Sequence, residues 1–83
     1  MARNAPRFSD LMMEAHRATV ALDALTGRDK SRAATAAVTR SRRVYSELLD
    51  YRHTARMTQS EANALQIASE QLRARLRLFG EDL

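Results

Sequence analysis

The sequence predicts an all-α fold: a three-helix bundle, or a long antiparallel helical hairpin with an added N-terminal helix, that is oligomeric. The composition is the first observation, because proline, glycine and aromatic residues are scarce and alanine, arginine and leucine abundant. Apolar residues also recur at steps of three and four in three segments. Finally, 83 residues without cysteine are near the lower size for independent folding, which leaves a further subunit as a source of stability.

The first predicted helix covers about residues 9–26 and follows a basic arm, residues 1–7, that we expect to be flexible. Ser9 or Asp10 is the expected N-cap, and Gly27 follows the last periodic residue, where a left-handed cap is favourable. One face of this helix is apolar and consists of Phe8, Leu11, Ala15, Ala18, Leu22 and Leu25.

The second predicted helix covers about residues 29–57, with Asp29 as its cap. Its apolar residues occupy nearly half of the circumference, so it is expected to contact two neighbours, and a monomer would leave part of this arc uncovered. Arg52 falls inside the arc, which means that either the bundle ends before it or the arginine is paired there.

The third predicted helix covers about residues 59–79 and completes a single helical domain, residues 8–80, followed by a tail at 81–83. Thr58 and Glu61 have the spacing of a capping box, and Gly80 ends the helix. The start of this segment resembles the first helix of a DNA-reading helix-turn-helix. However, neither glycine nor proline interrupts it before Gly80, so the tight turn of that motif is absent.

Two predicted helices carry a second, narrower apolar line about 180° from the core face, whereas a surface helix normally has a polar back. Scattered exposed apolar residues are the alternative explanation. Because the arrangement recurs on two helices, the sequence predicts an interface with a second copy or another protein. Its residues are Met13, Val20 and Ala24 on the first helix and Ile67, Ala74 and Leu78 on the third.

Basic residues offer a second candidate surface on a chain of net charge +4. Arg40, Arg42 and Arg43 spread around the second helix, where they form either a solvated face or a contact for nucleic-acid phosphates. Tyr51, Arg52 and Arg56 gather near its end, either as an ordinary polar helix end or as a site for a small anionic nucleotide at a subunit boundary.

The sequence contains no catalytic triad, phosphate-binding loop or metal-ligand spacing, so we expect no enzyme activity, cofactor or metal. No apolar run reaches the roughly 20 residues that cross a bilayer, and no signal-peptide core precedes the first helix, so a cytoplasmic protein without membrane contact is expected. The favoured function is a small protein-interaction module, such as an adaptor, inhibitor or chaperone-like protein. Nucleic-acid binding and nucleotide binding remain the alternatives.

Overall fold

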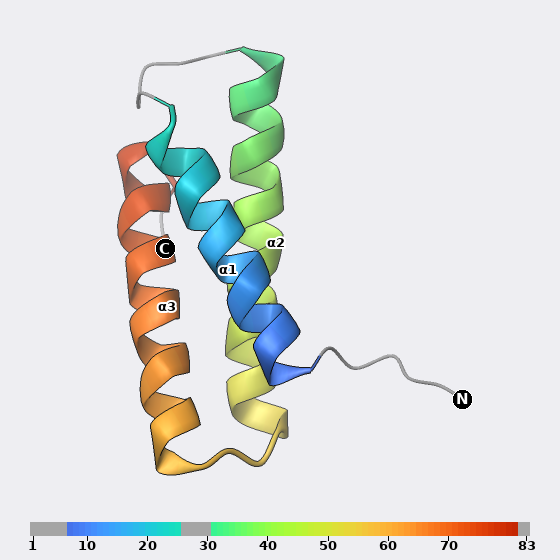
Figure 1. Cartoon of the computed structure of the whole chain (residues 1–83). Helices are drawn as coiled ribbons and strands as arrows, with labels where there is room; N and C mark the ends of the chain where they lie inside the picture. Colours follow the sequence, from blue (N-terminus) through green and yellow to red (C-terminus); the bar gives the residue numbers. More distant parts are fainter. Residues whose placement is uncertain (1–6, 26–30, 82–83) are drawn as a thin grey trace, which may run out of the picture.

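The computed structural model describes residues 7–25 and 31–81, and within these ranges it is all-helical, as predicted. Its three helices are α1 (Phe8–Asp23), α2 (Arg32–Thr54) and α3 (Gln59–Leu78). Each helix contacts the other two. Figure 1 shows α2 and α3 running antiparallel, while α1 lies across them in the same direction as α3.

α1 begins earlier and ends earlier than the sequence indicates. The predicted caps Ser9 and Asp10 are wrong, because Arg7 is the N-cap residue, with an extended backbone and no capping side-chain hydrogen bond. Asp10 instead lies in the first turn, where the helix dipole favours a carboxylate. The helix ends at Asp23 with Ala24 as its C-cap, and the predicted cap Gly27 lies outside the described residues.

α2 is shorter than the predicted 29–57. Ser31 caps it by accepting a hydrogen bond from the Ala34 amide at 3.2 Å, whereas Asp29 lies outside the described residues. The helix ends at Thr54, and Ala55 is extended (φ −98°, ψ 147°). Three residues, 55–57, therefore connect α2 to the cap of α3, and these are the residues that reverse the chain.

The predicted start of α3 is confirmed, and the helix ends one residue earlier than predicted, at Leu78, before Gly80. Thr58 Oγ1 accepts from the Glu61 amide at 3.1 Å, while Glu61 Oε1 accepts from the Thr58 amide at 3.0 Å, which completes the capping box. At the other end Gly80 has φ +87°. Its amide donates to Arg77 O at 3.1 Å and the Glu81 amide donates to Leu76 O at 3.2 Å, the two hydrogen bonds of a Schellman motif.

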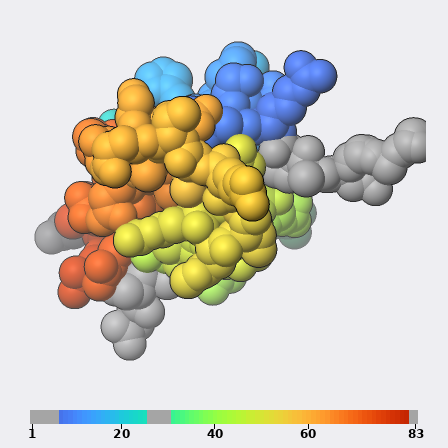
Figure 2. Space-filling view, turned by 90° about the horizontal axis from the view of Figure 1, so that it is seen from below, coloured from blue at the N-terminus to red at the C-terminus, as the bar shows by residue number. Residues whose placement is uncertain are grey.

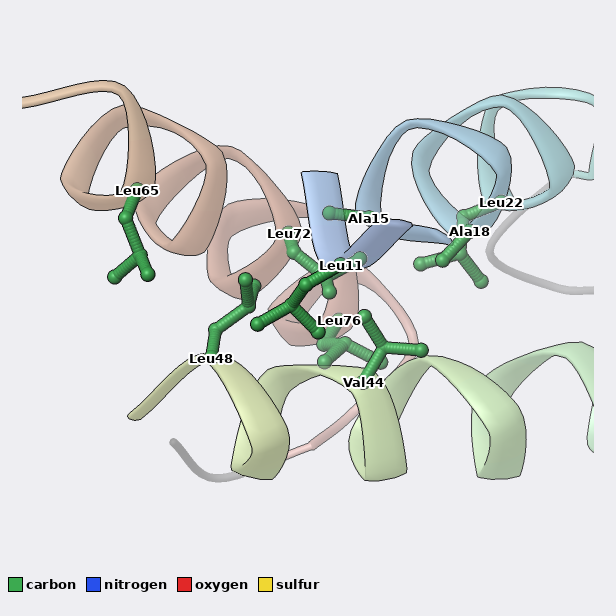
Figure 3. Packing of buried hydrophobic residues seen from close by; sticks show 9 residues of the cluster. All are labelled: Leu11, Ala15, Ala18, Leu22, Val44, Leu48, Leu65, Leu72 and Leu76. Atoms are coloured by element: carbon green, nitrogen blue, oxygen red, sulfur yellow. The ribbon is translucent and has the colours of Figure 1, made fainter. Parts of the chain in front are cut away.

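The core lies between the three helices and is built mainly from leucine and alanine (Figure 3). Small residues on α1 allow the other helices to approach its backbone closely. Ser69 fills the gap in the apolar face of α3, where its hydroxyl donates to Gln66 O at 2.9 Å. The buried cluster consists of Leu11, Ala15, Ala18, Leu22, Val44, Leu48, Leu65, Leu72 and Leu76.

The wide apolar arc of α2 is covered unevenly. Val44 and Leu48 are fully buried, but Val38, Tyr45 and Leu49 on one flank are only half-buried. Arg52 is exposed, so the core ends before this residue.

Candidate interaction surface

α1 and α3 run in the same direction, and an ion pair between them shows which of their residues lie at the same height along the bundle. Arg75 Nε donates to Asp23 Oδ1 at 2.8 Å, and the two residues are 52 positions apart in the chain. Arg75 Nη1 also donates to Gln71 O at 3.1 Å, which holds the guanidinium against its own helix. Together with the residues that line the groove between the helices, this pair indicates that residue n of α1 lies at about the height of residue n + 52 of α3.

At its N-terminal end α1 contacts α2. There the ring of Phe8 packs on Tyr51 of α2, with centroids 6.1 Å apart and an interplanar angle of 49°. The tilt of α1 in Figure 1 is consistent with these two contacts, one with α3 at its C-terminal end and one with α2 at its N-terminal end. Figure 2 views the bundle from the latter end and shows the first turns of α1 (blue) and α3 (orange) on the same side of the molecule.

A groove of about 330 Å³ lies between α1 and α3 where the two helices diverge. Alanines form much of its lining, and because an alanine side chain ends at Cβ, they leave the space that a larger residue would fill. The lining contains no aspartate, glutamate, lysine or arginine. Its residues fall into four pairs with the same offset of 52: Met12 with Ala64, Ala15 with Ile67, His16 with Ala68, and Thr19 with Gln71.

The second apolar lines predicted from the sequence flank this groove. Their four large side chains are exposed: Met13 by 53%, Val20 by 52%, Ile67 by 55% and Leu78 by 74%. Ala24 and Ala74 are exposed as well. At about 100° per residue, Val20 lies about 40° beyond the groove residue His16, and Ile67 itself lines the groove. We call the groove and these six residues the α1/α3 face; their role as an interface stays a prediction.

The α1/α3 face carries little charge. Among the described residues, helical spacing places only Asp23 and Arg75 as charged groups on it, and these two pair with each other. Arg17 and Glu70 stand at its two outer edges, about 20–40° beyond the apolar lines. The face is therefore apolar at its centre and internally neutral, with Arg17 and Glu70 as the charged residues next to its two apolar lines.

The basic residues of α2 are not gathered into one site. Arg40, Arg42 and Arg43 are exposed but point in different directions around the helix, and Arg42 pairs with Glu81 at 3.1 Å. Arg52 lies about 18 Å along the axis from Arg40.

The corner at the end of α2 differs from its prediction in one residue. Arg52 and Arg56 are exposed, but the Tyr51 ring packs on Phe8 and is half-buried. This leaves less of the aromatic face for stacking on a base. No cluster of metal-ligating side chains occurs among the described residues, and none of the described helices is long and apolar enough to cross a membrane.

Sequence reasoning identified the outer apolar lines but missed the groove between them. Met12, His16 and Thr19 follow one another at steps of four and three, which is the signal that could have marked a second flank of α1. The Asp23–Arg75 pair has no comparable signal, because the sequence does not give the relative height of two helices.

Comparison with known protein families, with curated proteins and with solved structures finds no match to this chain.

Proposed function

We propose that the protein is a small non-enzymatic, helical interaction module, such as an adaptor, inhibitor or chaperone-like protein, that binds a protein surface through its α1/α3 face. The observation that carries this proposal is the exposure of four large apolar side chains beside a groove without charged lining. Single exposed apolar residues are ordinary. A contiguous set that borders a groove is typical of a binding surface.

Energetics support the same function. Full burial of a large aliphatic side chain contributes about 1.5–3 kcal/mol, and four such side chains on this face are still at least half exposed. The core below them is already complete, since the inner leucines of α1 and α3 are buried without them. Covering the outer residues therefore requires a second molecule, either another protein or another copy of this chain.

Charge substitutions on the face test the proposal. We expect Val20→Asp and Ile67→Asp to abolish self-association and to release any protein that the wild-type chain retains from an extract of its own cells. Ala36→Asp on α2 is the matched control, because Ala36 is also exposed but lies away from the face. Sedimentation velocity gives the mass, and circular dichroism checks that the variants remain helical.

The proposal fails if both face variants keep the mass and the retained proteins of the wild type. It also fails if Ala36→Asp causes the same losses, since the effect would then be one of added charge.

Nucleic-acid binding is the second candidate, because Arg40 and Arg43 are exposed and form no ion pair with the described residues of a chain with net charge +4. Phosphate contacts release counterions, so affinity for DNA or RNA would fall steeply with salt and would weaken in Arg43→Glu. Absence of binding to duplex DNA and to RNA at low salt would remove this candidate.

Nucleotide binding near Tyr51 is the candidate function with the least support, because the ring of Tyr51 packs on Phe8. Calorimetry with a nucleotide panel would detect it, and the absence of heat for every member would exclude it.

A further inference from the structure

The register of α1 and α3 gives the six exposed apolar residues of the face defined heights along the bundle. Because residue n of α1 lies beside residue n + 52 of α3, Met13, Val20 and Ala24 are level with positions 65, 72 and 76. The α3 line occupies positions 67, 74 and 78. The two lines therefore alternate in height, and no residue of one is level with a residue of the other.

We infer that the α1/α3 face binds a second copy of this chain in a parallel, two-fold symmetric dimer, in which α1 of each copy packs on α3 of the other. The inference rests on the proposed function and names the partner. A two-fold axis parallel to the helices preserves heights. Along each α1–α3 contact the side chains then follow in the order Met13, Ile67, Val20, Ala74, Ala24 and Leu78, taken alternately from the two copies, at intervals of about 3–8 Å. No two of these residues therefore share a height, so the arrangement lets them alternate along the contact.

The edges of the face are complementary in the same arrangement. Arg17 is level with position 69, one residue from Glu70, so each edge of the dimer places an arginine of one copy beside a glutamate of the other. Arg17 forms no ion pair with the described residues of its own chain. Glu70 accepts one hydrogen bond, from Gln66 Nε2 at 2.7 Å, and retains acceptor capacity for a guanidinium.

The antiparallel alternative lacks this complementarity. With the axis perpendicular to the helices, α1 lies on α1 of the second copy, and aligning Met13 with Val20 brings Arg17 next to Arg17 of that copy. Adjacent like charges oppose association. The parallel arrangement replaces this repulsion with two attractive pairs.

Net charge also favours this face for self-association. Each copy carries +4, so two copies repel unless the arginine-bearing surfaces stay apart. The face between α1 and α3 is opposite α2, which carries Arg40, Arg42 and Arg43 (Figure 1). The charges on the face itself, Asp23 and Arg75, already compensate each other.

The available area sets the expected strength of the dimer. α1 is about 24 Å long and a two-helix face is about 20 Å wide, which gives on the order of 500 Å² per copy. A total of about 1,000 Å² is near the lower limit for a specific interface, so we expect a weak, reversible dimer.

Disulfide trapping tests the arrangement cleanly, because the chain contains no cysteine. A disulfide requires Cβ atoms about 3.5–4.5 Å apart. We expect a mixture of Val20→Cys and Ala74→Cys to form a cross-linked heterodimer on mild oxidation, since these positions are adjacent across the parallel interface. Either variant alone should form no more disulfide than the control Ala36→Cys on α2.

Two results overturn the inference. Efficient cross-linking of Val20→Cys with itself would show that α1 lies on α1, as in the antiparallel arrangement. A wild-type chain that stays monomeric up to several hundred micromolar, with no cross-link in the mixture, would exclude the dimer. The proposed function has a separate readout. If a monomeric wild-type chain retains a foreign protein that Ile67→Asp releases, the proposed function is supported, and only the inference that the partner is a second copy is wrong.

Charge reversal gives an independent check of the edges. We expect Arg17→Glu and Glu70→Arg each to weaken the dimer by about tenfold, and the double variant to recover most of the affinity. Sedimentation equilibrium at low and at high salt measures these changes, and thermal unfolding confirms that each variant folds. Losses that simply add in the double variant would contradict the pairing of Arg17 with Glu70.

Discussion

The α1/α3 face and the outer surface of α2 are both exposed helical surfaces of one small bundle, yet they differ in composition. The surface of α2 carries five exposed arginines (Arg32, Arg40, Arg42, Arg43 and Arg52), of which Arg42 is paired with Glu81. The α1/α3 face carries a groove, four large apolar side chains and one ion pair that neutralises itself. Solvation accounts for the first surface, because charged side chains gain from contact with water.

Solvation does not account for the second surface, and neither does the core. On α3 the inner residue Leu72 is completely buried, whereas Ile67, on the opposite side of the same helix, is 55% exposed. Two apolar lines on one helix thus have different roles in the monomer: one stabilises the fold and the other contributes little to it. This difference is the reason why we propose the outer line as a binding surface.

The largest expected effect separates these two lines. We expect Leu72→Ala to reduce the free energy of unfolding by about 2–5 kcal/mol, because it removes buried methyl groups and leaves a cavity. Ile67→Ala should change it by no more than about 0.5 kcal/mol when measured on the monomer, since that side chain is mostly in water. Urea unfolding at a concentration below that of self-association makes this measurement.

The prediction would be contradicted if Ile67→Ala were as destabilising as Leu72→Ala. Ile67 would then belong to the core of the monomer, and its exposure would no longer support a binding surface. At high protein concentration Ile67→Ala should become destabilising, because association stabilises the folded state by mass action.

Much of the architecture follows from local signals in the sequence. The capping box of α3 needs only Thr58 and Glu61 at the right spacing, and the end at Gly80 needs only a residue that tolerates positive φ. The inner and outer apolar lines follow from the helical period alone. These features depend on neighbours within one or two helical turns, which is why they could be predicted.

Features that depend on contacts between helices could not be predicted. The groove lies between α1 and α3, and the sequence specifies neither the tilt of α1 nor its contacts with α2 at Phe8 and with α3 at Asp23. α1 also begins without the side-chain cap expected from Ser9 or Asp10, since packing of Phe8 extends the helix by a residue beyond the local signal. The length of α2 was overestimated because its apolar pattern continues into the connection to α3.

A smaller loss of stability is expected where the end of the chain contacts α2, through the ion pair between Glu81 and Arg42. We expect Gly80→Ala to reduce stability by about 1 kcal/mol, because alanine is strained at φ +87° although its Cβ would meet no neighbouring atom. The change should loosen the Schellman motif that places Glu81 beside Arg42. Sedimentation velocity should show unchanged self-association, because Gly80 follows α3 and is not itself one of the residues of the α1/α3 face, the last of which is Leu78. A loss of association would instead mean that the chain end contributes to the interface.

Removal of either ion pair should have the smallest effect on stability. The two pairs should differ in their effect on association, because one lies on the α1/α3 face and the other on the surface of α2. Arg75→Gln and Glu81→Gln each remove one partner of a partly exposed pair, so each should change stability by less than about 1 kcal/mol. Their effects on association should differ. Arg75→Gln leaves the Asp23 carboxylate uncompensated on the face that we propose a partner covers, and we expect association to weaken by about three- to tenfold.

Glu81→Gln is the matched control, because it leaves Arg42 uncompensated on a surface that stays in water, where a free guanidinium costs little. The double variant with Asp23→Asn and Arg75→Gln carries no charge at this position and should recover most of the lost affinity. Equal weakening by Arg75→Gln and Glu81→Gln would mean that net charge, and not desolvation of Asp23, governs association. The proposal that association uses the α1/α3 face and not the surface of α2 would then lose its support.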